Sequence, residues 1–165
     1  MKPTKAINLI TASILGAVVA YLLSIWSVRT GRPLPISTPS MLTTLPLIAL
    51  VLLLIAIPIF KYRSAVKAAI EKKTSQTKPV KRLDPFYAIR VAMLAKATSI
   101  AGAIFVGWHV GVLLTVLGQP TEAATAIVRC VFGITGAVLM IVSGIIVERA
   151  CRIPPDAGDT DASAA

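Results

Sequence analysis

Hydrophobic residues fall into four long blocks that shorter polar segments separate. The blocks cover residues 7–28, 41–60, 94–117 and 123–147. About 20 consecutive apolar residues in a helix cross the ~30 Å hydrocarbon core of a bilayer. The pattern therefore predicts an all-α integral membrane protein, a four-helix bundle in which a basic cytoplasmic linker joins two helical hairpins. We assign residues 1–154 to this membrane domain and expect the acidic segment 155–165 to be disordered.

Composition supports the same class. Hydrophobic residues make up 56% of the chain, charged residues make up 15%, and the mean hydropathy is +0.81. Soluble domains carry about 25% charged residues, so a soluble fold is excluded. Cys130 and Cys151 fall on one expected helix and its end, about 31 Å apart at the helical rise per residue, which is too far for a disulfide. Cysteine usage therefore says nothing about the redox compartment.

The first block could be a retained helix or a signal peptide, because Lys2 and Lys5 precede it. The apolar region of a signal peptide has about 7–15 residues, and a cleavage site between small residues follows it. The block from Ile7 to Val28 is longer and ends without such a site, so we expect a retained helix. Small residues recur every four positions along it: Ala12, Gly16, Ala20 and Ser24. They leave a shallow groove in which another helix can approach closely.

Polar segments define the connections between the blocks. Residues 29–40 are rich in proline and predict a short ordered loop. Residues 61–84 form the basic linker, and its first part can continue the second helix. Asp84 and Pro85 are typical of a helix start. A helix from there to Leu117 would be about 50 Å long, so we expect its first turns to lie in or below the headgroups.

Basic residues are concentrated on one side of the expected membrane. They lie near the N-terminus, at residues 61–90, and at Arg149 and Arg152, whereas Arg29 and Arg32 lie on the opposite side. Basic loops are retained in the cytoplasm. We therefore expect a multi-pass membrane protein with both termini and the linker on the cytoplasmic side.

His109 is the single histidine and lies near the middle of the third span. An ionisable group at this depth is costly and is often functional, as a proton-linked or ligand-binding residue. The alternative is a neutral histidine that hydrogen-bonds to a neighbouring helix. We favour this packing role, because no Asp or Glu lies in any span to complete a proton relay. Ala95, Gly102 and His109 share one helix face, so we expect the ring to point into the bundle.

Arg129 lies in the fourth span, about 9 Å from its middle at the helical rise per residue. Its charge can reach the outer headgroups if the side chain extends, which is the interpretation we favour. It could instead point inward and bind an anion or a partner's carboxylate. Glu122 shares its helix face but lies too far along the axis to be an assured partner.

The basic residues within 61–82 have three interpretations. The first is retention at the cytoplasmic surface with contact to anionic lipid headgroups, at about 1 kcal/mol per basic residue. The second is a docking site for an acidic cytoplasmic partner. The third is a nucleic-acid contact, which we do not expect, because the segment lacks the interleaved aromatic residues that stack on bases.

No enzyme pattern is present in the chain. It contains no GxSxG motif, no P-loop, no GxGxxG motif and no Cys/His cluster with metal-ligand spacing. Cys130 lies on an apolar face and is expected to pack rather than to react. We therefore expect no enzyme activity, no catalytic residue, no metal and no cofactor.

Two stretches resemble a known family. They are LDPFYAIRVAMLAKATSIAGAIFVGWHVG and the later VERACRIPP, and they are similar to bacterial membrane proteins grouped as domain of unknown function 3180. The positions that recur in that family correspond to Arg90, Leu94 to Ala97, Gly102, Glu148, Cys151 and Arg152. The resemblance covers the layout from Lys2 to Pro155. It implies a small multi-pass protein of the bacterial cell membrane without assigned catalytic residues.

The sequence favours a structural or partner-binding membrane component whose basic linker is the cytoplasmic contact surface. The expected partners are the bilayer, its anionic headgroups, and either another membrane protein or a second copy of the chain. The alternative is a subunit of a small oligomeric transporter or channel, since four helices form a pathway only by assembly. The candidate functional or interaction residues are Arg90, Lys96, His109, Arg129, Glu148 and Arg152.

Overall fold

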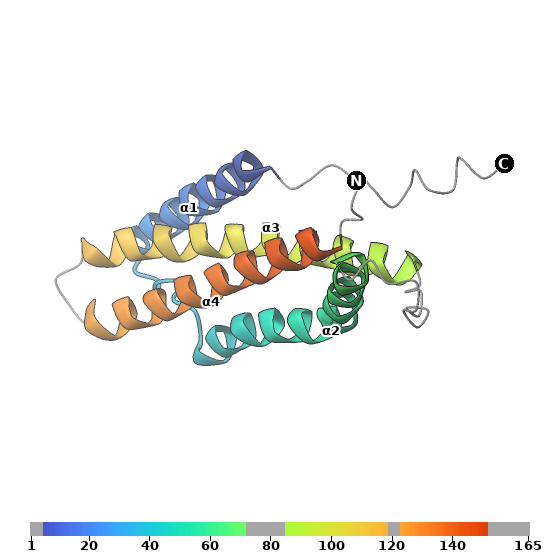
Figure 1. The fold of residues 1–165 in the computed structure, drawn as a ribbon. Helices are drawn as coiled ribbons and strands as arrows, with labels where there is room; N and C mark the ends of the chain where they lie inside the picture. The colour runs from blue at the N-terminus through green and yellow to red at the C-terminus, as the bar shows by residue number, and fades with distance from the viewer. Residues whose placement is uncertain (1–4, 72–84, 119–122, 152–165) are drawn as a thin grey trace.

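The computed structural model describes residues 5–71, 85–118 and 123–151, which form four α-helices (Figure 1). The helices are α1 (Ala6–Arg29), α2 (Pro39–Glu71), α3 (Pro85–Leu117) and α4 (Ala123–Ala150). Each is long and apolar enough to cross a membrane, and the described residues contain no strand. The predicted all-α class with four candidate spans is confirmed. The linker beyond residue 71 and the acidic tail lie outside the described residues.

Helices α3 and α4 form the central pair, and the other two helices lie on opposite sides of it (Figure 1). α1 packs against α3, whereas α2 packs against α4 and, to a smaller extent, against α3. Within the part of the chain that the structure describes, α1 and α2 do not pack against each other. The second expected hairpin is therefore a packed unit, but the first two helices are joined only by their connecting segment.

The helix termini define two ends of the bundle. At the hairpin end, α3 ends at Leu117 and α4 begins at Ala123. At the opposite end, which we call the basic end, α3 begins at Pro85 and α4 finishes at Ala150. The two central helices are therefore antiparallel, and the basic end is the one toward which α2 runs.

Small residues allow α3 and α4 to approach closely. A Cβ on Gly144 would lie 2.7 Å from the carbonyl oxygen of Ala95. A Cβ on Gly102 would lie 2.9 Å from the carbonyl oxygen of Ala137. Both distances are shorter than a real Cβ contact, so only glycine fits at these two positions. The face of α3 that the sequence predicted to point inward does lie against α4.

The groove predicted on α1 is filled by α3. Three of its four positions are buried: Gly16, Ala20 and Ser24. A Cβ on Gly16 would lie 2.6 Å from the carbonyl oxygen of Ile104, and a Cβ on Gly107 or Gly111 of α3 would overlap the backbone of α1. Small residues spaced by four are typical of closely packed membrane helices. The Gly107/Gly111 pair, in the stretch GWHVG, has the same spacing of four but was not among the predicted contacts.

Helix α2 continues past its expected span and changes direction near the basic end. It runs to Glu71, and Figure 1 shows a sharp turn where its colour passes from teal to green. Pro58 lies inside this helix and explains the turn, because proline lacks an N–H and its ring displaces the preceding turn. The carbonyl oxygen of Ile55 in that turn accepts a 2.7 Å hydrogen bond from the Tyr87 hydroxyl of α3. A tertiary contact thus stabilises the bend.

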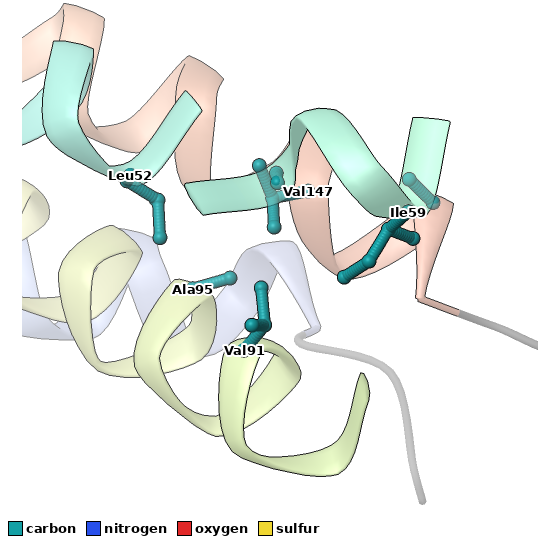
Figure 2. Packing of buried hydrophobic residues seen from close by; sticks show 7 residues of the cluster. Leu52, Ile59, Val91, Ala95 and Val147 are labelled. Atoms are coloured by element: carbon teal, nitrogen blue, oxygen red, sulfur yellow. The ribbon is translucent and has the colours of Figure 1, made fainter. Parts of the chain in front are cut away.

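A cluster of buried apolar side chains joins three helices at the basic end. Figure 2 shows Leu52 and Ile59 of α2 converging on Val91 and Ala95 of α3 and on Val147 of α4. In a bilayer the lipid tails are as apolar as these side chains, so close packing rather than water exclusion holds them together. The cluster fixes α2 to the central pair at the same end as the bend.

Candidate functional site

His109 is held by two hydrogen bonds inside the bundle. Its side chain is 2% exposed. Nδ1 lies 2.7 Å from the carbonyl oxygen of Phe105, and Nε2 lies 3.0 Å from Oγ of Ser37. A carbonyl oxygen only accepts, so Nδ1 donates its proton, and in the neutral ring Nε2 accepts from the Ser37 hydroxyl. Both ring nitrogens therefore have a partner.

The imidazole ring packs against Gly133 of α4. A Cβ at position 133 would overlap the ring of His109, so this contact requires glycine. His109 points into the bundle, on the face predicted for it. We expected a hydrogen bond to a neighbouring helix, but the partner is Ser37, which lies in the connection between α1 and α2. The difference arises because this connection folds back into the bundle.

We call this connection, residues 30–38, the strap. Leu34 and Ile36 of the strap pack against a buried cluster toward the hairpin end. The members of that cluster are Ala20, Val112, Val116, Ala126 and Cys130. Because Ser37 also binds His109, the inner side of the strap packs against the interior of the bundle, while its other side stays exposed. The ordered loop predicted from the sequence is therefore closer to the centre of the molecule than a surface turn would be.

The first residues of the strap stay near the end of α1. The hydroxyl of Thr30 donates a 2.8 Å hydrogen bond to the carbonyl oxygen of Trp26. Gly31 has a φ of 67°, a conformation that favours glycine and that turns the chain back. The Arg32 guanidinium then lies 5.0 Å from the centre of the Trp26 ring, a cation–π contact.

Polar contacts also fix the basic end. Nη1 of Arg63 donates a 2.7 Å hydrogen bond to the carbonyl oxygen of Arg149. This carbonyl belongs to the last turn of α4, where carbonyl groups lack intrahelical donors and the helix dipole favours a cation. Residues 61–71 of α2, which we call the basic extension, are therefore attached to the end of α4.

Three candidate residues of the sequence analysis lie toward the basic end. Arg90 and Lys96 are exposed on α3, and Glu148 is partly buried in the last turn of α4. Arg152 lies outside the described residues. Cys151 follows α4 directly, and burial raises the pKa of its thiol, so the thiolate is scarce at neutral pH.

The remaining two candidates, His109 and Arg129, lie in the other half of the bundle. Arg129 is half-buried on α4 and makes no hydrogen bond or ion pair within the described residues. Its proposed neighbour Glu122 lies outside them. The candidate residues thus do not converge on one site but are divided between the two ends of the molecule.

Most other buried polar side chains are satisfied locally. Thr98, Ser99, Thr115 and Ser143 donate to carbonyl oxygens three or four residues earlier in their own helices. The exception is Ser24, whose Oγ is buried without a partner in the described part of the chain. No three His, Cys, Asp or Glu side chains of the described residues lie close enough together to hold a metal ion. Buried polar groups form separate pairs rather than a continuous chain across the bundle.

Four apolar helices, packed through glycine contacts and separate hydrogen bonds, define a multi-pass membrane protein. The chain belongs to the family described as protein of unknown function (DUF3180), whose sequence pattern matches residues 9–155. The match includes nearly the whole of all four helices, which confirms the resemblance noted in the sequence. No curated protein and no solved structure matches the chain.

Proposed function

We propose that the protein is a structural or partner-binding component of the bacterial cell membrane and that its basic end is the contact surface. In this proposal both termini and the basic extension lie in the cytoplasm, because positive loops are retained there. The hydrogen bond from Arg63 to the carbonyl oxygen of Arg149 carries the proposal. It supports a positive surface with a defined position on the bundle rather than a charged tether.

The exposed cations of this surface favour a negatively charged partner. Lys61, Arg63, Arg90 and Arg149 are exposed toward the basic end. Each basic residue near an anionic leaflet contributes about 1 kcal/mol to lipid binding, so the surface is held at the headgroups. Guanidinium groups also bind carboxylates through paired hydrogen bonds. An acidic segment of a second protein is therefore the partner class that the surface fits best.

A subunit of a small oligomeric transporter or channel has less support. Self-association through the small-residue groove on α1 would need a free groove, but α3 fills it. A pathway through one chain would need a continuous line of polar groups, whereas the buried hydroxyl groups of Thr98, Ser99, Thr115 and Ser143 bond to their own helices. The proposal includes no catalytic step and no cofactor.

Site-specific photo-crosslinking in native membranes tests the choice of surface. A photoreactive residue in place of Ser64, which is exposed on the basic extension, is expected to give a defined protein adduct identified by mass spectrometry. The matched control is the same substitution at Thr30, exposed near the opposite end. The charge reversal Arg63→Glu is expected to remove the Ser64 adduct while the protein level stays normal.

The outcomes separate the parts of the proposal. If only lipid adducts form at Ser64, partner binding is overturned, and the structural role is the part of the proposal that remains. A defined protein adduct at Thr30, with none at Ser64, would overturn the choice of surface. Labelling of Thr30→Cys by an impermeant thiol reagent from the cytoplasmic side would overturn the orientation.

A further inference from the structure

Part of the strap lies inside the bundle, displaced along the helix axes from the hairpin end toward the basic end. His109, which binds Ser37, lies about 12 Å from the end of α3 at the helical rise per residue. Gly133, which contacts the same ring, lies about 15 Å from the start of α4. Figure 1 shows α2 beginning short of the end that α3 and α4 share. Ser37 and the start of α2 are therefore deep in the molecule.

The outside of the bundle is apolar up to the hairpin end. Leu114 and Leu117 of α3 are 57% and 63% exposed, and Val128 and Val131 of α4 are 53% and 51% exposed. Side chains of this kind on a membrane helix face lipid. Because the apolar surface extends to the last turn of α3, the level of the hydrogen-bonded pair falls inside the ~30 Å hydrocarbon core.

The strap lacks the hydrogen bonds that such an environment demands. Among the described residues, the N–H groups of Leu34, Ser37 and Thr38 donate to no acceptor. Pro33 and Pro35 have no N–H, which reduces the number of donors but does not remove these three. An unpaired backbone group in hydrocarbon costs several kcal/mol, and irregular backbone occurs at membrane depth only where protein buries it or water reaches it.

Protein covers the strap only in part. Leu34 and Ser37 are half-buried, whereas Thr38 and Ser40 are exposed at the start of α2. The exposed side of the strap therefore carries hydroxyl groups and unpaired amides at a depth where the neighbouring helices present apolar side chains. Of the two environments that tolerate irregular backbone, only water remains for this side.

We propose that water enters from the hairpin end, hydrates the exposed side of the strap and reaches the Ser37–His109 pair. The access ends there, because Leu45 of α2 packs against Met140 of α4 on the next level toward the basic end. The access is one-sided. His109 itself is 2% exposed and both of its ring nitrogens are paired, so the incoming water, or a small neutral solute that hydrogen-bonds, meets the half-buried Ser37 rather than the imidazole. This access does not depend on the partner proposed for the basic end.

Cysteine labelling with a charged, membrane-impermeant thiol reagent tests this access. In a chain with Cys130→Ala and Cys151→Ala, the variants Thr38→Cys and Ser40→Cys are expected to react with reagent added from the side of the hairpin end. Phe132→Cys is the matched control, because Phe132 is 64% exposed at the same depth but faces lipid. A neutral maleimide added in detergent is expected to label all three variants, which controls for folding and expression.

The expected result is that positions 38 and 40 react with the charged reagent about tenfold or more faster than position 132, since hydrocarbon disfavours both the reagent and the thiolate. Equal protection of all three positions would show that lipid or another protein covers the strap, and the access would be disproved. Equal reaction at all three would place this level outside the hydrocarbon, which also overturns the proposal.

Discussion

Gly133 and His109 fit together because one side chain is missing where the other is large. Gly133→Ala is expected to destabilise the protein by about 1–3 kcal/mol, the usual range for overpacking, because the added methyl group overlaps the ring. Thermal unfolding of the purified protein in detergent measures the loss. The double variant Gly133→Ala/His109→Ala is expected to regain part of it, since the smaller side chain frees the space.

Gly118→Ala is the matched control for that substitution. A Cβ at Gly118 would meet only the carbonyl oxygen of Thr115, at an ordinary 3.4 Å. Its melting temperature should stay close to that of the wild type. An equal decrease in both variants would contradict a specific contact between Gly133 and the imidazole.

Ser37→Ala removes the hydroxyl that donates to Nε2 of His109. The change leaves a buried acceptor without its donor, and a loss of about 1 kcal/mol in stability is expected, within the range measured for hydrogen bonds inside membrane proteins. Ser40→Ala is the control, because the hydroxyl of Ser40 contacts only the hydroxyl of Thr38. Equal unfolding midpoints for Ser37→Ala and the wild type would show that the bond contributes nothing to stability.

Residue patterns in the sequence predicted which faces of the helices point inward, but they did not predict which residues those faces contact. The small-residue groove on α1 and the inward face of His109 followed from helical spacing alone, because spacing fixes which side chains share a side. Ser37 could not be identified as the partner of His109, since the two residues are 72 positions apart and nothing local links them. Gly107 and Gly111 have the same spacing of four, but no helix contact was predicted for them.

At the scale of elements, the bend in α2 controls where the basic extension lies. Pro58→Ala restores a backbone N–H and is expected to straighten the helix, which moves the extension away from α4. Spin labels at Ser64→Cys and Ile146→Cys, in a chain without Cys130 and Cys151, report the change by pulsed electron paramagnetic resonance. The distance between the labels should increase and its distribution should broaden.

Pro46→Ala serves as the control for the bend, since Pro46 lies in the same helix but far from the extension. Its distance distribution should match that of the wild type. An unchanged distribution in Pro58→Ala would mean that the contacts of Arg63 and Tyr87 hold the bend without the proline.

The existence of the helices followed from the sequence, but their neighbours did not. Block length determines whether a segment can cross a bilayer, so four apolar blocks were sufficient to predict four helices. Pairing depends on where backbones can come close, because leucine-rich surfaces pack equally well against each other and against lipid. Gly107 and Gly111 let α1 approach α3 closely, a pairing that chain order alone does not predict.

For the whole molecule, α1 has a single helical neighbour, since among the helices of the described residues only α3 contacts it. A chain divided after the exposed Gly31, with residues 1–31 and 32–165 produced as two pieces, is expected to reassociate and co-purify in mild detergent. Gly111→Leu in the larger piece should abolish co-purification, because the leucine side chain would overlap the backbone of α1.

Leu114→Val in the larger piece is the matched control, since Leu114 is on the same helix and 57% exposed. It should leave co-purification unchanged. Failure of the unaltered pieces to associate would show that the connection, rather than the glycine contacts, holds α1 in place.

The placement of α1 and α2 on opposite sides of the central pair also orders the events of synthesis. When the ribosome has delivered these two helices to the membrane, neither has its packing partner. The partner of α1 is α3 and that of α2 is chiefly α4, and both are synthesised later. At ~5–20 residues per second the second half of the chain follows only after several seconds. During that interval insertion factors and membrane proteases meet two solitary helices. A product truncated after α2 would therefore be degraded as an orphan instead of persisting as a stable hairpin.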